Sequence, residues 1–338
     1  MKYRENIDTS KPYKQKYLDG LNNVISLREK ELEVKRQEYC KDIFTNQELY
    51  REDFKNMLGW PLIGYQNKGV PTVKAEKLSE EDGYNIYRMS FEVLDGLEMT
   101  GLFFELNGKD KKPLVIVQHG GLGTPELISG IYNSTGTYND MLTRVVAHGA
   151  HAFAPQLLLW KHEEYGVPFS RADVDARLKR VGSSITAVEL FAMSRILDYF
   201  ELQKNVSNFG MLGLSYGGFY TLYLSAIDKR IKSAISCGYF NTRDDYKWSD
   251  WTWFNSASTF DDAEVACLVY PRKLCIEIGD KDPYFNVEYG KNAYKKLKDL
   301  TKPVGDSWLD FIVFDGEHEF CKDDKPITEL IDTLIKNV

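Results

Sequence analysis

The hydrophobic and polar positions divide the chain into three stretches with different periods. Residues 21–50 mix many charged residues with scattered Leu, Val and Ile, a composition that favours helix without a sustained heptad seam. Residues 84–93 and 97–106 alternate apolar and polar positions on either side of Asp95-Gly96, which predicts an antiparallel hairpin. From residue 113 onward, short apolar runs without alternation are separated by longer helix-like segments.

This third pattern predicts strands that are buried on both faces, with helices between them. We expect strands at 113–119, 150–155, 209–214, 231–237, 273–278 and 309–314, and helices at 139–148, 184–200, 217–227, 287–300 and 326–336. Strands that alternate with helices build a parallel sheet covered on both faces. The predicted fold class is therefore α/β, with a mostly parallel central sheet flanked by helices.

The change of pattern also predicts how the chain is divided. We expect an N-terminal helical arm, residues 1–70, and an α/β catalytic domain, residues 71–338. The interspersed apolar residues of the arm indicate a helix that packs on the body or on a second copy of the chain. The second case would make the protein a homo-oligomer.

Composition narrows the possible partners and the compartment. The net charge is −7 and no basic stripe occurs, which argues against nucleic acid. The five cysteines are odd in number and show no paired spacing, which favours a reducing compartment over a disulfide framework. The N-terminus lacks the apolar core of a signal peptide, and no run of about 18 apolar residues occurs. We expect a cytoplasmic protein that does not bind membranes.

A candidate nucleophile lies between a predicted strand and a predicted helix. The segment Gly213-Leu-Ser215-Tyr-Gly217 is a G-x-S-x-G sequence at that junction. A serine on such a sharp turn presents its hydroxyl at the carboxyl end of the strand, and glycine two residues before and after avoids collisions. The N–H of Tyr216 then points into the same space. The alternative is a glycine-rich turn with a bystander serine.

A base and an acid follow the last two predicted strands. His318 comes directly after the strand at 309–314, at the sheet edge where parallel sheets build their sites. Asp280 and Asp282 follow the strand at 273–278, and we prefer Asp282 because it is nearer the turn enforced by Pro283. The acid would orient the histidine and stabilise its imidazolium form. The order Ser, Asp, His is the one expected of the α/β-hydrolase fold.

The remaining histidines are given other places. His148 lies at a helix end, His151 in a strand and His162 in a loop with two glutamates. No carboxylate or cysteine set accompanies His148 and His151, so we expect no metal site, and none of the chemistry requires a cofactor.

The glycine-rich segment after the first buried strand is the candidate oxyanion hole. An N–H of Gly121 or Leu122 is expected to join that of Tyr216 in binding the substrate oxygen. A phosphate-binding loop is the rival interpretation, but no Gly-Lys-Ser/Thr follows the glycines. We expect His119 to anchor this loop rather than to react.

These motifs together resemble the α/β-hydrolase superfamily over about residues 75–338. The pieces that carry the resemblance are HGGLGTPE (119–126), GLSYGG (213–218), GDKDPYF (279–285) and DGEHEF (315–320). Within the superfamily, the chain looks most like the acetyl xylan esterase, cephalosporin deacetylase and dienelactone hydrolase group. Residues 50–60 and 180–189 are also similar to segments of that group. The resemblance implies an α/β-hydrolase fold with an N-terminal helical extension.

The resemblance also bears on the reaction. Ser215 stands where dienelactone hydrolases carry cysteine, which speaks against their reaction. We expect hydrolysis of small carboxylic esters, of the short-acyl or acetylated carbohydrate type, through an acyl-enzyme on Ser215. Two alternatives stay open. One is a peptidase of prolyl-oligopeptidase type, which shares GLSYGG but carries a propeller domain for which this chain has no room. The other is a non-catalytic binding protein on the same scaffold.

Two loops are candidates for the walls of the substrate pocket. Trp248, Trp251 and Trp253 follow one predicted strand, and residues 157–165 follow another. Both loops lie at carboxyl ends of strands, where inserted loops form lids. The tryptophan rings suit sugar rings as substrate-binding residues. The alternative is that these aromatic residues pack the loop onto the body.

Overall fold

A computed structural model describes residues 1–66, 69–160, 162–243, 246 and 248–336. Within these residues, nine strands form one sheet in the order β1-β2-β3-β5-β4-β6-β7-β8-β9. The strands are β1 (Thr72–Glu81), β2 (Tyr84–Leu94), β3 (Leu97–Leu106), β4 (Lys112–Gln118), β5 (His151–Pro155), β6 (Val206–Leu214), β7 (Ile231–Cys237), β8 (Lys273–Gly279) and β9 (Leu309–Phe314). Strands β4 to β9 pair in parallel, whereas the β1–β2, β2–β3 and β3–β5 pairs are antiparallel.

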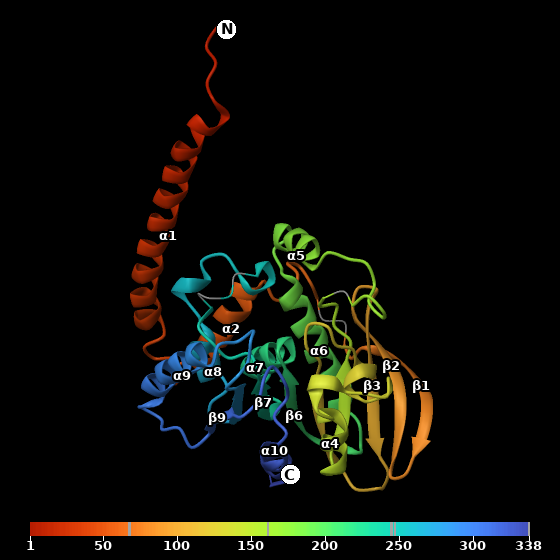
Figure 1. Cartoon of the computed structure of the whole chain (residues 1–338). Helices are drawn as coiled ribbons and strands as arrows, with labels where there is room; N and C mark the ends of the chain where they lie inside the picture. The colour runs from red at the N-terminus through yellow and green to blue at the C-terminus, as the bar shows by residue number, and fades with distance from the viewer. Residues whose placement is uncertain (67–68, 161, 244–245, 247, 337–338) are drawn as a thin grey trace.

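The helices cover both faces of this sheet (Figure 1). They are α1 (Lys11–Tyr39), α2 (Gln47–Leu58), α3 (Pro125–Ile128), α4 (Met141–Ala147), α5 (Arg171–Arg180), α6 (Ile185–Glu201), α7 (Tyr216–Ile227), α8 (Asp262–Cys267), α9 (Val287–Thr301) and α10 (Lys325–Lys336). Helices α2, α6, α7, α8 and α9 contribute buried residues to one core, and α4 and α10 contribute to the other. The predicted α/β class and its mostly parallel central sheet are confirmed.

Strand β4 shows why its sequence lacks alternation. Leu114 and Ile116 are buried in the core on one face of the sheet, whereas Val115 and Val117 are buried in the core on the other face. Successive side chains of a strand point to opposite faces, so a strand covered on both sides needs apolar residues throughout. The β2–β3 hairpin, which the alternating stretches predicted, is also present, with Leu94 opposite Leu97 at its turn.

The N-terminal helices differ from the predicted single helix over residues 21–50. Helix α1 begins ten residues earlier, at Lys11, and ends at Tyr39, and α2 follows at Gln47. In the break between them, Cys40 and Ile43 are buried against the body. Helix α2 packs into the core through Tyr50, Phe54 and Leu58, which are spaced four residues apart.

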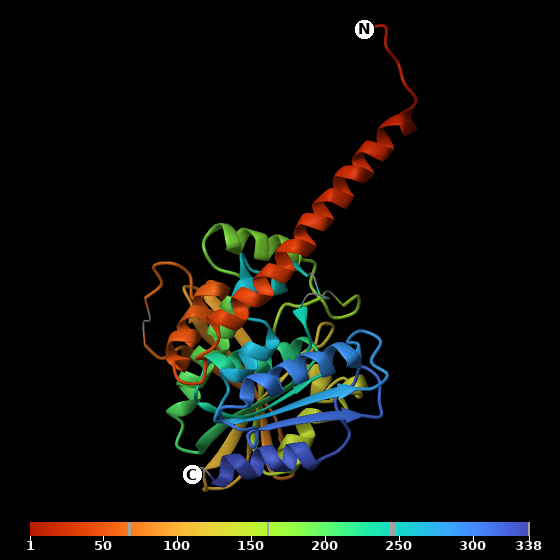
Figure 2. The same ribbon diagram turned by 90° about the vertical axis from the view of Figure 1, so that its left-hand side faces the viewer.

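Most of α1 lies away from the rest of the molecule. Figures 1 and 2 show it projecting from the body, and Arg36, near its C-terminal end, is its buried residue. The side chain of Arg36 donates a hydrogen bond to the Ala257 carbonyl at 2.8 Å. No helix in the described part of the chain is long and apolar enough to cross a membrane.

Candidate active site

Ser215 lies on a strained turn between β6 and α7. Its φ and ψ are 62° and −122°, which a non-glycine residue rarely adopts. Its N–H donates a hydrogen bond to the Cys237 carbonyl at 2.9 Å. The turn requires the flanking glycines, because a Cβ on Gly217 would lie 2.1 Å from the Gln118 carbonyl oxygen, and one on Gly213 would lie 2.6 Å from the Gly217 carbonyl. The chain therefore forms the elbow that G-x-S-x-G predicts.

His318 and Asp282 lie together at the same edge of the sheet. His318 follows β9 and Asp282 follows β8, and the imidazole Nδ1 lies 2.7 Å from Asp282 Oδ2. The Asp282 side chain is fully buried, and the His318 side chain is 17% exposed. The His318 ring also lies against Gly238, because a Cβ there would be 3.4 Å from two of its ring atoms. Gly238 adjoins Cys237, whose carbonyl accepts from Ser215, so the pair lies beside the elbow.

The second aspartate of this loop has a different partner. Asp280 Oδ1 accepts a hydrogen bond from the Gly316 N–H at 3.2 Å, and the Asp280 N–H donates to the Phe314 carbonyl at 2.9 Å. Asp280 thus joins the loop after β8 to the loop after β9. Among the described residues, it is Asp282 and not Asp280 that the structure brings to the imidazole of His318.

The glycine-rich loop after β4 is held by bonds that leave two N–H groups available. The Gly120 N–H donates to the Tyr138 hydroxyl at 2.9 Å, and the Gly123 N–H donates to the Gly120 carbonyl at 3.0 Å. Within the described part of the chain, the N–H groups of Gly121 and Leu122 donate no hydrogen bond. These are the two groups that the sequence predicted for the oxyanion hole.

His119 is buried beside this loop and joins it to the segment that follows β5. Its Nδ1 lies 2.9 Å from the Gly120 carbonyl, and its Nε2 accepts from the Leu157 N–H at 3.1 Å. Those contacts require the proton on Nδ1. Burial lowers the pKa of His119 to about 4, so the ring stays neutral at pH 7. The geometry is that of an anchor for the loop.

A buried ionic network contacts the side chain of Tyr216, next to the nucleophile, and the sequence did not reveal it. Arg171 Nε donates to Asp250 Oδ2 at 2.7 Å, and its Nη2 donates to Glu189 Oε2 at 2.8 Å. The Tyr216 hydroxyl donates to the same Asp250 oxygen at 3.1 Å. The network therefore joins α5, α6 and the loop after β7, which carries Asp250, to Tyr216, the residue after the nucleophile. Its members lie far apart in the sequence, and no local motif marks them.

The three tryptophans after β7 do not share one environment. Trp248 is 36% exposed and stacks on the Tyr216 ring, with centroids 5.8 Å apart. Trp251 and Trp253 are only 2% and 5% exposed, and Trp253 Nε1 donates to Ser184 Oγ at 3.3 Å. Their rings pack the loop onto the body and are not open to a substrate. We therefore keep only Trp248 as a candidate substrate-binding residue.

The structure adds aromatic residues to the surroundings of the site. The Tyr284 ring meets the His318 ring edge-on at 5.0 Å, and the Phe285 ring stacks on it at 5.5 Å. Trp160 lies after β5, within the loop 157–165, which the sequence pointed to only as a whole. No group of three or more His, Cys, Asp or Glu side chains is placed to hold a metal ion within the described residues.

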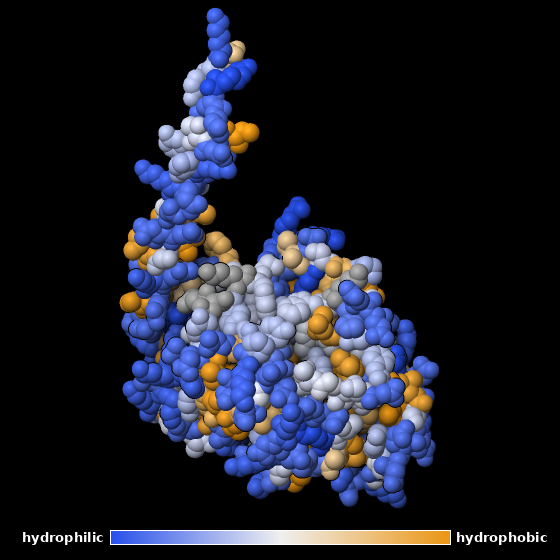
Figure 3. Space-filling view, viewed as in Figure 1, coloured by the Kyte–Doolittle hydropathy of each residue, from blue (hydrophilic) through white to orange (hydrophobic). Residues whose placement is uncertain are grey.

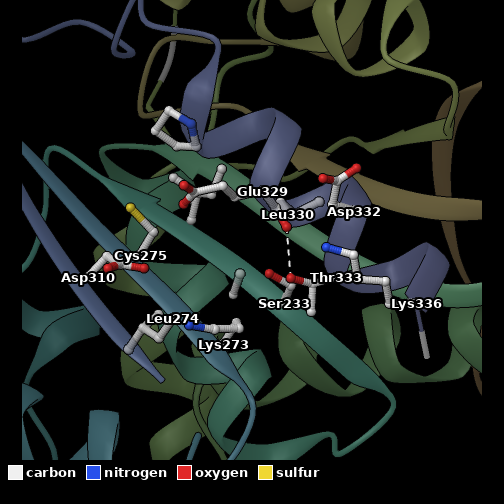
Figure 4. A pocket seen from close by; sticks show the side chains of 13 residues that line it. Ser233, Lys273, Leu274, Cys275, Asp310, Glu329, Leu330, Asp332, Thr333 and Lys336 are labelled. Carbon is white, nitrogen blue, oxygen red and sulfur yellow. Dashed lines mark hydrogen bonds between the residues drawn. The ribbon is translucent and has the colours of Figure 1, made fainter. Parts of the chain in front are cut away.

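A cavity elsewhere in the molecule is separate from this site. It has a volume of about 300 Å³ and lies between α10 and strands β7, β8 and β9 (Figure 4). Ser233 and Lys273, which line it, stand near the amino ends of their strands. Ser215, Asp282 and His318 all follow carboxyl ends, at the opposite edge of the parallel strands.

Comparisons with known proteins agree with the fold. No protein-family model matches the sequence, and no curated protein matches it. Solved structures do match in three dimensions. A promiscuous CE15 esterase from a marine bacterial metagenome has a TM-score of 0.62 at 15% identity, over 87% of this chain and 92% of that one.

Two further structures match with somewhat lower TM-scores. A glucuronoyl esterase from Solibacter usitatus has a TM-score of 0.60 at 14% identity, over 84% of this chain and 91% of that one. Acetyl xylan esterase 1 from Thermoanaerobacterium sp. has a TM-score of 0.55 at 15% identity, over 86% and 94%. At this level of identity the likeness concerns the fold, and the chain has the α/β-hydrolase fold.

Proposed function

We propose that this protein is a serine hydrolase that cleaves small carboxylic esters through an acyl-enzyme on Ser215. The observation that carries the proposal is the Asp282–His318 pair, at 2.7 Å, beside a serine on a strained strand-to-helix turn. Structural packing alone does not call for a buried carboxylate paired with an imidazole next to a strained serine turn. Perturbed or strained groups gathered in this way are typical of functional sites.

Each residue of the site has its own role in acyl transfer. His318 Nε2 takes the proton of the Ser215 hydroxyl while Oγ attacks the ester carbon. Asp282 accepts the Nδ1–H hydrogen bond, which fixes the tautomer and stabilises the imidazolium that forms. The N–H groups of Tyr216 and of Gly121 or Leu122 bind the oxyanion of the tetrahedral intermediate.

The second half of the reaction uses the same groups. The imidazolium gives its proton to the leaving alkoxide, and the acyl group stays on Ser215. His318 then takes a proton from water, whose oxygen attacks the acyl carbon. The bond between that carbon and Ser215 Oγ breaks as the imidazolium returns its proton to Oγ, which releases the acid and restores the free serine. No cofactor enters either half-reaction.

An ester of a short acyl group, such as an acetylated sugar, is the substrate class we propose. The solved structures that match in fold bear the names of esterases of acetylated xylan and of glucuronoyl esters. The five free thiols, four of them buried, support a reducing compartment and hence a cytoplasmic location.

A substrate panel tests this proposal. It contains p-nitrophenyl esters of rising acyl length, acetylated sugars, cephalosporin C and aminoacyl anilides. We expect acetyl esters to be preferred over octanoyl esters, with acetate released from the sugars. Efficient cleavage of the anilides with weak ester turnover would replace the proposal with a peptidase. A lack of turnover on every member would favour the non-catalytic binding protein.

A further inference from the structure

We propose that the indole of Trp160 closes the acyl side of the site and restricts the enzyme to short acyl groups. This inference rests on the proposed ester hydrolysis, and it assigns to one residue the choice of acyl length. Trp160 follows β5 and is 44% exposed as a residue, so part of its surface is open to a ligand.

The indole lies directly against the candidate oxyanion loop. The backbone N–H of Trp160 donates a hydrogen bond to the Gly121 carbonyl at 2.8 Å. A Cβ on Gly121 would lie 2.8 Å from Cε3 of the indole, so only glycine leaves room for the ring at this place. The backbone bond and the ring contact together fix the indole relative to the N–H of Gly121.

The same ring also contacts the side chain of Tyr216, the residue whose N–H is the other candidate oxyanion donor. It meets the Tyr216 ring edge-on at 5.5 Å and the Trp248 ring edge-on at 5.3 Å. Trp248 in turn lies flat on Tyr216, with an interplanar angle of 6°. The three rings form one wall, which we call the Trp160 wall (Trp160, Tyr216 and Trp248). Aromatic pairs in such geometries contribute stabilisation beyond that of their buried area, so each ring restrains the others.

The direction of the substrate follows from the order of the strands. The leaving oxygen must face His318, because the imidazolium protonates it. The oxyanion must face the N–H groups of Tyr216 and of Gly121 or Leu122. In the sheet, β9 lies on one side of β6 and β5 on the other, so His318 and Trp160 stand on opposite sides of Ser215. The acyl group, which points away from the leaving oxygen, is therefore directed toward the Trp160 wall.

A fixed indole at this position sets a limit on acyl length. An acetyl group needs little space beyond the carbonyl carbon, whereas each further methylene has to displace the ring or turn into water. A methylene that fits or fails to fit a pocket changes kcat/KM by about 10- to 200-fold. Removing the indole opens this space without changing the triad or the backbone of the oxyanion loop.

The test compares acyl-length preference in Trp160→Ala and in the full-length parent protein. We expect the ratio of kcat/KM for p-nitrophenyl acetate to that for p-nitrophenyl octanoate to fall by at least about tenfold in the variant. Trp160→Phe, which keeps a smaller ring, should give an intermediate ratio. Labelling of Ser215 by a fluorophosphonate and an unchanged melting temperature would show that both variants retain the fold.

Tyr284→Ala is the matched control on the opposite wall. Tyr284 is 64% exposed and contacts His318 on the side of the leaving group. This variant should alter the preference among acetate esters of different alcohols and leave the acyl-length ratio as it is. An unchanged ratio in a folded, active Trp160→Ala would overturn the inference alone. Failure of the parent protein to cleave any ester would overturn the proposed function instead.

Discussion

Asp282 uses its two carboxylate oxygens for different contacts. Oδ1 accepts hydrogen bonds from the N–H groups of Tyr284 at 2.8 Å and Phe285 at 2.9 Å, which fixes the carboxylate in the loop. Oδ2 is then directed at His318. An amide in place of this carboxylate keeps the size but can present an N–H to the imidazole, which favours the wrong tautomer.

Asp282→Asn should accordingly lower kcat by up to about 10,000-fold. Asp280→Asn changes a residue of the same loop that bonds the Gly316 N–H, and it should cost far less. The two variants are compared on p-nitrophenyl acetate after a check of their melting temperatures. If Asp280→Asn proves the crippled variant, the orienting acid is Asp280.

Glu277 is a buried carboxyl group on β8 that the mechanism does not use. It is 1% exposed, and burial raises its pKa to about 7 from an ordinary value near 4.5. The folded state therefore holds this proton more tightly than the unfolded state. Its contribution to stability is fully present below about pH 4.5 and is lost as the pH rises through 7.

Glu277→Gln should remove this loss. The free energy of unfolding of the variant minus that of the parent protein should rise by about 1–3 kcal/mol from pH 5 to pH 8. Urea unfolding at both pH values measures this difference. Glu329→Gln on the exposed face of α10 is the control and should show no such gain. An equal difference from the parent protein at both pH values would mean that Glu277 does not titrate in this range.

At the scale of elements, the sheet and the elbow follow most directly from the sequence. A strand buried on both faces must be apolar throughout, and the serine turn must have glycine at 213 and 217, so both leave a local pattern. Helices α5 and α8 were not predicted. Helix α5 is largely polar, and its N-cap bond from the Asp173 N–H to Ser170 gives only a weak sequence signal.

The residues of the candidate site also fall into a group that the sequence predicted and a group that it did not. Ser215, Asp282 and His318 were predictable because each directly follows a strand. Arg171 was not predicted as a contributor, and Trp160 only as one member of the loop 157–165, because their positions depend on how long loops fold back over the sheet edge. Local sequence patterns carry no information on that packing.

The elbow glycine gives a prediction at this scale. Gly217→Ala would place a Cβ 2.1 Å from the Gln118 carbonyl oxygen, a backbone atom that cannot move aside easily. We expect a loss of at least about 2 kcal/mol in unfolding free energy, together with loss of activity. The matched control is Gly20→Ala in α1, where nothing lies within 4 Å. It should be neutral or stabilise by about 0.5–1 kcal/mol, because alanine favours helix. Equal melting temperatures for the two variants would contradict the close packing at the turn.

At the scale of the whole molecule, helix α1 projects from the body, and packing against the body does not account for its apolar residues. Leu18, Leu21 and Ile25 are spaced as residues on one helix face, and each is about half exposed. Figure 3 shows apolar side chains along this otherwise polar arm. Residues 1–18 carry five basic and two acidic residues in a chain of net charge −7, so the arm is complementary in charge to the body.

We propose that α1 associates with a second copy of the chain. The double variant Leu21→Glu/Ile25→Glu should lower the mass in solution to that of the 38.9 kDa monomer, as measured by light scattering after size exclusion. Glu substitutions at the exposed Lys30 and Lys35 of the same helix serve as a control for added charge. A monomeric parent protein, or an assembly that the double variant leaves intact, would contradict the proposal.

The proposed ester hydrolysis depends on Ser215 acting as a nucleophile. The most direct measurement is covalent labelling by a fluorophosphonate, followed by peptide mass spectrometry, with p-nitrophenyl acetate turnover assayed in parallel. We predict one label, on Ser215, and the loss of both labelling and turnover in Ser215→Ala. Full turnover in Ser215→Ala, or a label on another residue, would contradict a mechanism in which Ser215 is the nucleophile.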